Sequence, residues 1–173
     1  MDSSKLEKLI SYEFKNKDLL KEALAHRSYL NENPKWHLPH NERLEFLGDA
    51  VLELIITEAL FEKFPKEPEG KLTTLRAALV NYQMLAKLSK EINLEKFILM
   101  SRGEAKDTGR AREVILANAM EALIGALYLD GGYDGAKNFI EKNLLPEIKE
   151  VIKMGLDKDP KSLLQEKSQA EMK

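Results

Sequence analysis

The chain has no cysteine among its 173 residues, which excludes disulfides, thiolate metal sites and a cysteine nucleophile. An excess of positive charge is also missing, since 27 Lys and Arg against 29 Asp and Glu give a net charge of −2. No global positive field therefore attracts nucleic acid, although local basic clusters could still do so. The N-terminus has no apolar signal region, and no apolar run approaches the roughly 18 residues of a membrane span. We expect a soluble, cytoplasmic protein without a small-molecule cofactor.

Alternating runs of β-branched residues are absent too, so no strand is predicted. Apolar residues instead recur at helical spacing, and 43% hydrophobic content suffices for one core. The sequence predicts an all-α fold. We expect loops at 31–40 and 101–110. Helices are predicted over 16–24, 41–64, 70–80, 81–88 and 112–130, with Asn16, Asn41 and Asn81 as caps. A further helix is expected to begin within 6–10. A last amphipathic segment, 133–153, should bend or break at Pro146.

Three carboxylates share one face of the predicted helix 41–64. Glu42, Glu45 and Asp49 stand at i, i+3 and i+7, and no Lys or Arg follows any of them by four residues. Neighbouring like charges cost a few tenths of a kcal/mol each, so their concentration beside apolar positions indicates a bound cation. Oxygen ligands suit a hard ion such as Mg²⁺ or Mn²⁺. Taken alone, the same pattern is more often a solvated acidic face.

A second acidic position interrupts the apolar run of 112–130. Glu121 lies there among core-type residues, and Asn118 precedes it by one helical turn on the same side. If the two helices pack together, these side chains form a small oxygen-rich pocket in an apolar interface. That arrangement favours a metal site over a solvated surface.

The stretch from Asn41 to Val51, NERLEFLGDAV, resembles the characteristic motif of ribonuclease III, the Mg²⁺-dependent double-stranded RNA endonuclease. The likeness extends in the expected order over roughly residues 5–153. It includes Phe14, Asn16, Leu19, Leu20, Ala23, Leu24, His26 and Ser28, then 69–81 (EGKLTTLRAALVN) and 121–133 (EALIGALYLDGGY).

The resemblance implies roles for individual residues. The acidic catalytic positions match Glu42, Glu45, Asp49 and Glu121, of which we expect Glu45, Asp49 and Glu121 to hold the metal. Asn118 stands where the family most often has Asp; its carbonyl oxygen can still bind a cation or a metal-bound water, but without the charge. With Glu42, it is expected to position water or complete the metal's surroundings.

Four further residues are candidates for contacts with RNA or with a partner subunit. Glu69 matches an acidic family position near bound RNA, and Lys71 and Arg76 are candidate phosphate contacts. By resemblance, Phe46 is the dimer plug that enters a pocket of the partner subunit. The alternative is that Phe46 packs under a loop of its own chain.

The resemblance implies a homodimer that hydrolyses duplex RNA in rRNA and mRNA processing and leaves 5′-phosphate and 3′-hydroxyl ends. Two other functions remain open. Asn118 would suit a weakened or inactive RNA-binding scaffold. A di-iron oxidoreductase is disfavoured, because no His follows Glu42, Glu45 or Glu121 by three residues.

The domain prediction has three parts. Residues 1–153 are expected to form the catalytic domain, and 154–160 a polar linker. Residues 161–173 resemble the first helix of a double-stranded RNA-binding domain, which is incomplete. We therefore expect a truncated or naturally short form, with truncation favoured, and weak affinity for RNA.

Overall fold

The computed structural model describes residues 3–155, and this part of the chain is helical with no strand. Its elements are α1 (Ser3–Ile10), α2 (Lys17–Ala23), α3 (Arg27–Glu32), α4 (Glu42–Lys63), α5 (Glu69–Val80), α6 (Tyr82–Glu91), η1 (Leu94–Lys96), η2 (Glu104–Lys106), α7 (Arg110–Asn143), η3 (Leu145–Glu147) and α8 (Ile148–Lys153). The predicted all-α class is confirmed. Most of the predicted linker, and all of 161–173, lie outside the described residues.

Two of the three predicted helix caps are confirmed. The Asn16 side chain accepts a hydrogen bond from the backbone N–H of Asp18, and Asn81 accepts one from Met84. Asn41 precedes α4 as predicted, but its side chain does not cap the helix. The buried amide donates to the carbonyl of Ala23 instead, 3.4 Å away. Asn41 therefore ties the start of α4 to the end of α2.

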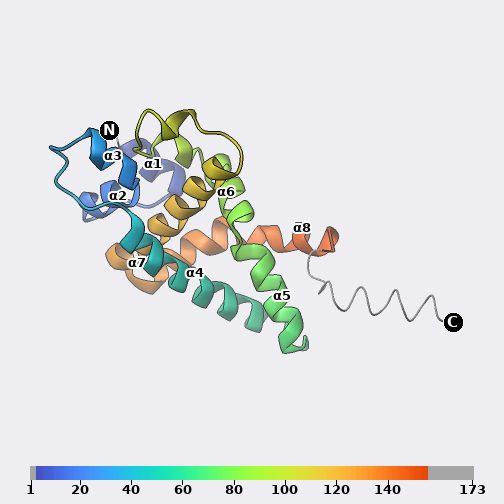
Figure 1. The fold of residues 1–173 in the computed structure, drawn as a ribbon. Coiled ribbons are helices and arrows are strands. Elements are labelled where there is room, and N and C mark those ends of the chain that lie inside the picture. Colours follow the sequence, from blue (N-terminus) through green and yellow to red (C-terminus); the bar gives the residue numbers. More distant parts are fainter. Residues whose placement is uncertain (1–2, 156–173) are drawn as a thin grey trace.

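α7 forms the centre of the domain, and Figure 1 shows α4 and α6 beside it. Its first half buries nearly every side chain from Ile115 to Leu127. By length and composition α7 and the residues after it could span a membrane, but 61% of that apolar window is buried in the protein. This apolar stretch is the core helix of the fold.

The predicted end of the second acidic helix near Gly131-Gly132 appears as a sharp break inside α7. Gly132 has a φ of 68°, in the left-handed region that a side chain disfavours. Just before it, the Asp130 carboxylate accepts hydrogen bonds from the Tyr12 hydroxyl and from the backbone N–H groups of Lys15 and Asn16. These contacts hold the bend against the N-terminal part of the chain.

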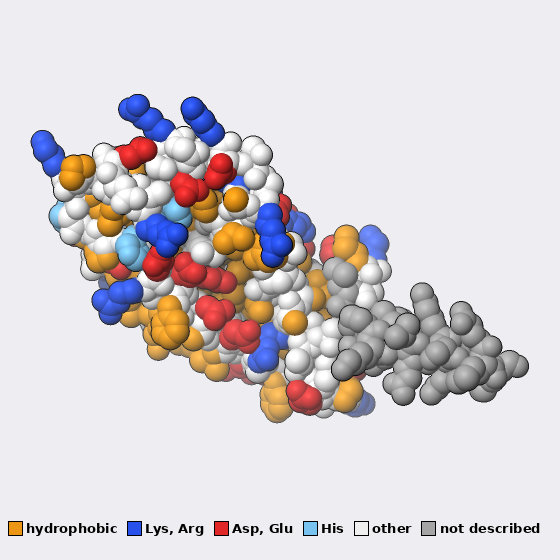
Figure 2. Space-filling view, viewed as in Figure 1, with side chains coloured by type: hydrophobic (Ala, Val, Ile, Leu, Met, Phe, Trp, Pro, Cys, Tyr) orange, Lys and Arg blue, Asp and Glu red, His pale blue; other side chains and the backbone are white. Residues whose placement is uncertain are grey.

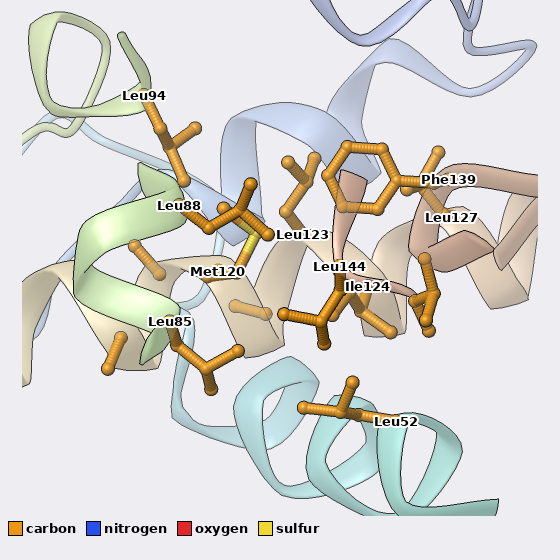
Figure 3. Close-up of a cluster of buried hydrophobic side chains, with 14 of the residues drawn as sticks. Leu52, Leu85, Leu88, Leu94, Met120, Leu123, Ile124, Leu127, Phe139 and Leu144 are labelled. Carbon is orange, nitrogen blue, oxygen red and sulfur yellow. The ribbon is translucent and has the colours of Figure 1, made fainter. Parts of the chain in front are cut away.

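Side chains from several helices meet in one core. Figure 3 shows Leu52 of α4 and Leu85 and Leu88 of α6 facing Leu123 and Ile124 of α7. The core thus fixes α4 against the first half of α7, the two helices that carry the predicted carboxylates. The break predicted at Pro146 is present as η3, between the end of α7 and α8.

α3 was not predicted as a separate helix. The imidazole of His26 caps it by accepting a hydrogen bond from the backbone N–H of Ser28. Histidine is not among the residues preferred at this position, which explains the omission. The segment 101–110, predicted to be a loop, contains the short helix η2.

Candidate active site

Two glycines let α4 and α7 cross at very close range. A Cβ atom at Gly48 would collide with the backbone carbonyl of Glu121, and one at Gly125 would collide with the carbonyl of Leu44. Gly48 lies between Glu45 and Asp49 in sequence, and Gly125 lies one turn after Glu121. The close crossing therefore brings these carboxylates from distant parts of the chain together.

The carboxylates of Glu45, Asp49 and Glu121 interact strongly. Burial, and then the charges of Asp49 and Glu45, raise the pKa of Glu121 to about 8. Burial also raises the pKa of Glu45, with further contributions from Glu42 and Asp49. Every charged neighbour that shifts these two carboxyls is itself an acid. The site therefore lacks compensating positive charge at both groups, and a cation would supply it.

The carboxylates do not converge closely enough for three of them to bind one ion directly. Within residues 3–155, no three His, Asp or Glu side chains are close enough to share an ion directly. Mg²⁺ usually keeps several waters and binds one or two carboxylates directly. An all-oxygen site with uncompensated acids fits such an ion, with some ligands reaching it through water.

Glu42 and Asn118 lie at the edges of the acidic cluster. Glu42 is exposed, and its carboxylate lies 3.6 Å from the guanidinium of Arg27 and 3.8 Å from the imidazole of His40. Asn118 is half-buried on α7, one turn before Glu121. Whether Asn118 binds the ion directly, and whether both residues position water, stay predictions.

The three residues predicted to lie at the RNA are all on α5. The Arg76 guanidinium is 3.0 Å from the carboxylate of Glu53 and donates to the Thr57 hydroxyl, also at 3.0 Å. Glu69 accepts a hydrogen bond from Thr73. Arg76 thus packs against α4 at Glu53, one turn beyond Asp49, whereas Glu69 and Lys71 lie in the first turn of α5. Their roles toward RNA stay predictions.

Phe46 is 82% exposed, so the alternative that it packs under a loop of its own chain is wrong. Leu54 and Phe61 of the same helix are 58% and 72% exposed. Their spacing from Phe46, eight and fifteen residues, places all three on one side of α4. Figure 2 shows acidic side chains gathered on the face that α4 crosses, with hydrophobic side chains beside them. Three large exposed apolar side chains on one side of a helix, which we call the exposed stripe, are typical of an interface.

Sequence reasoning missed the two crossing glycines, although a signal was present. Glycine inside a helix costs about 1 kcal/mol relative to alanine, so Gly48 in the middle of α4 needed a packing reason. His40 lies only two residues before Glu42 in the sequence, but its proximity was not used. Arg27 was missed because nothing in the sequence places it beside Glu42. That proximity arises from the path of the chain between α2 and α4.

The comparisons with known proteins agree on one family. A profile described as Ribonuclease-III-like matches residues 16–148. "Ribonuclease 3" of Streptococcus gordonii is 50% identical over 135 residues, which cover 78% of this chain and 58% of that protein. "Ribonuclease 3" of Pseudomonas aeruginosa is 48% identical over 162 residues, which cover 94% and 68%. The chain thus spans between about half and two thirds of the length of these relatives.

A solved structure gives the same result for the fold. The nuclease domain of ribonuclease III from Campylobacter jejuni, described with structural flexibility in a region involved in dimer formation, superposes with a TM-score of 0.73 at 48% identity. The match covers 84% of this chain and 99% of that domain. A family-wide profile, two relatives near 50% identity and a shared fold lead to one conclusion: the chain belongs to the ribonuclease III family, and its described residues form that family's nuclease domain.

Proposed function

We propose that this chain is a divalent-metal-dependent endonuclease that hydrolyses phosphodiester bonds of double-stranded RNA. The observation that carries the proposal is the meeting of Glu45 and Asp49 on α4 with Glu121 on α7, where burial and mutual repulsion raise the pKa of Glu121 to about 8. Such an arrangement is unfavourable without a cation and well suited to Mg²⁺, for which Mn²⁺ is expected to substitute.

The chain's own residues divide the work between binding the ion and placing water. Glu45, Asp49 and Glu121 are expected to hold the ion, directly or through water. When bound, the ion lowers the pKa of a coordinated water and neutralises charge that builds up on the phosphate oxygens. Glu121 holds its proton near neutral pH in the metal-free site, and binding of the cation would release that proton.

Glu42 and Asn118 are expected to orient the attacking water. In the proposed reaction, the water oxygen forms a bond to phosphorus and the bond from phosphorus to the 3′ oxygen breaks. The products are a 5′-phosphate and a 3′-hydroxyl, which takes up a proton. Lys71 and Arg76 are proposed to contact phosphates, and Glu69 to lie near the bound RNA.

A homodimer is the proposed active form, with each subunit cutting one strand. The exposed stripe of Phe46, Leu54 and Phe61 supports it, because about 1.5–3 kcal/mol is gained when such a side chain becomes buried. Phe46 is the proposed anchor. A cytoplasmic location and a part in rRNA and mRNA processing belong to the same proposal.

The test is cleavage of a long RNA duplex with Mg²⁺ by the chain and two variants. Glu121→Gln should abolish cleavage, whereas Glu113→Gln should retain it. Glu113 lies on the same helix two turns earlier, and its carboxylate faces Lys90 at 3.5 Å, so it controls for the loss of an acid on α7. EDTA should stop the reaction, and the products should be degraded by an exonuclease that requires a 5′-phosphate.

Equal loss of activity in the two variants would refute the assignment of Glu121. Cleavage that survives EDTA would refute the metal dependence. An inactive RNA-binding scaffold, the alternative suggested by Asn118, is not favoured, because the matched relatives are named ribonucleases.

A further inference from the structure

One short segment connects the start of the active-site helix with the basic part of the chain. The backbone of 24–26 pairs with Leu99: the Leu99 N–H donates to Leu24 at 2.8 Å, and the His26 N–H donates to Leu99 at 2.9 Å. Between these two bonds, the Ala25 carbonyl accepts from the N–H of Asn41 at 2.9 Å. Asn41 is followed directly by α4. The segment is therefore hydrogen-bonded on both sides.

Beyond Leu99 the chain enters what we call the basic segment, residues 102–112, which contains Arg102, Lys106, Arg110 and Arg112. These four cations outnumber the two acids of the same segment, Glu104 and Asp107, and give it a net charge of +2 in a protein of net charge −2. They would attract phosphate on their own, but their effect on catalysis depends on where they are held relative to the acidic site.

The first residues of the basic segment are anchored on α3. The Ser101 N–H donates to the hydroxyl oxygen of Ser28 at 3.0 Å, and the Arg102 N–H donates to the carboxylate of Glu32 at 3.2 Å. Ser28 is almost fully buried, whereas Glu32 is exposed. A buried hydrogen bond is stronger than one in water, so Ser28 is the firmer of the two anchors.

The hydroxyl of Ser28 is itself oriented by His26. The Ser28 oxygen lies 2.7 Å from His26 Nδ1, which also accepts the Ser28 N–H at 3.3 Å. Because that nitrogen accepts, the hydroxyl proton points toward it and a lone pair is left for Ser101. Burial lowers the pKa of His26, which disfavours the doubly protonated imidazole in which this nitrogen could not accept a hydrogen bond. Between these two residues, Arg27 reaches the acidic site through Glu42 at 3.6 Å.

We propose that Ser28 is a positioning residue that sets the basic segment in register with the carboxylates at the crossing of α4 and α7. Phosphates bound by the basic segment are then held where the scissile phosphate meets Glu45, Asp49 and Glu121. Ser28 touches neither RNA nor the ion. The inference rests on the proposed function, because it assigns the basic segment to the same RNA duplex.

The test compares Ser28→Ala with Ser89→Ala. Ser89 is fully buried in α6 and donates to the Leu116 carbonyl at 2.9 Å, so its replacement also removes a buried serine hydroxyl that is hydrogen-bonded within the protein. We expect Ser28→Ala to raise the KM and the Kd for duplex RNA about fivefold, the equivalent of one hydrogen bond, with kcat within about twofold. Both variants should lose thermal stability to a similar extent, but Ser89→Ala should leave the KM and Kd unchanged.

A second measurement does not depend on RNA. Amide hydrogen exchange should become faster at Ser101 and through η2 in Ser28→Ala, and stay unchanged there in Ser89→Ala. Unchanged exchange at Ser101, or an equal rise of the Kd in both variants, would overturn the role of Ser28.

The two proposals fail in different ways. If the unchanged chain binds duplex RNA but does not cut it, the proposed function fails, while the Kd and exchange comparisons still decide the role of Ser28. If the chain neither binds nor cuts RNA, both proposals fall.

Discussion

Replacing Gly48 by alanine tests the physical basis of the site most directly. The added methyl group would collide with the backbone carbonyl of Glu121 and approach the N–H of Gly125. Backbone atoms inside two packed helices cannot move aside as a flexible side chain can. Overpacking of this kind costs about 1–3 kcal/mol, and sometimes more. Alanine recovers up to about 1 kcal/mol through its better helix propensity. Because the collision is with backbone, we take the upper end of the overpacking range, about 3 kcal/mol. The expected net destabilisation is then about 2 kcal/mol, which lowers Tm by about 4–8 °C in a domain of this size.

Gly70→Ala is the matched control. Gly70 also lies in a helix, but no atom comes within 4 Å of a Cβ atom built there. The control should be neutral or stabilised by up to about 1 kcal/mol. Differential scanning calorimetry measures both variants. Separation of the helices in Gly48→Ala should also misplace Glu121 and reduce kcat by up to about 100-fold. A Tm for Gly48→Ala at or above that of the unchanged chain would refute the close crossing.

Three further predictions concern the site and the exposed stripe. Glu121 has a folded pKa of about 8 against an ordinary 4.5, so the folded chain binds the proton more tightly than the unfolded chain. Urea unfolding in EDTA should therefore show the free energy of unfolding falling by about 1–3 kcal/mol from pH 5 to pH 8. Glu121→Gln should flatten this dependence, and an unchanged slope in that variant would refute the raised pKa. Asn118→Asp should lower the Mg²⁺ concentration needed for half-maximal cleavage and lower Tm in EDTA, because it adds a charge to the acidic cluster; an unchanged Mg²⁺ dependence would place Asn118 outside the metal's surroundings. Phe46→Ala should weaken the dimer by about 2 kcal/mol or more in sedimentation equilibrium, whereas Leu9→Ala on α1 should not, and equal effects of the two changes would contradict Phe46 as the anchor.

Much of the fold followed from local patterns that need no tertiary information. Helical spacing of apolar residues and the side chains of Asn16 and Asn81 placed most of the helices and two of their caps correctly, although α3 and η2 were missed. The break at Gly131-Gly132 was predictable because glycine tolerates the left-handed conformation found at Gly132. Asn41 marked the start of α4, but its side chain hydrogen-bonds to the end of α2 and does not cap α4. That contact could not be predicted, because it depends on where the chain folds back.

The candidate site divides in the same way. Glu42, Glu45 and Asp49 could be placed on one helix face from spacing alone, and Glu121 stood out as an acid in an apolar run. The distance between the two helices could not be read from spacing, because it is set by Gly48 and Gly125 meeting backbone to backbone. The anchoring of the basic segment by Ser28 was likewise hidden, since it joins residues far apart in the chain.

The amino-acid sequence by itself determined an all-α domain, the identity of its acidic residues and the family they resemble, because these depend on residue type and on spacing within single helices. The tertiary structure alone decided which acids meet, how strongly they raise the pKa of Glu121, and that Phe46 lies on the surface. The physical reason is that burial and repulsion act through space, at distances set by how helices pack rather than by position along the chain.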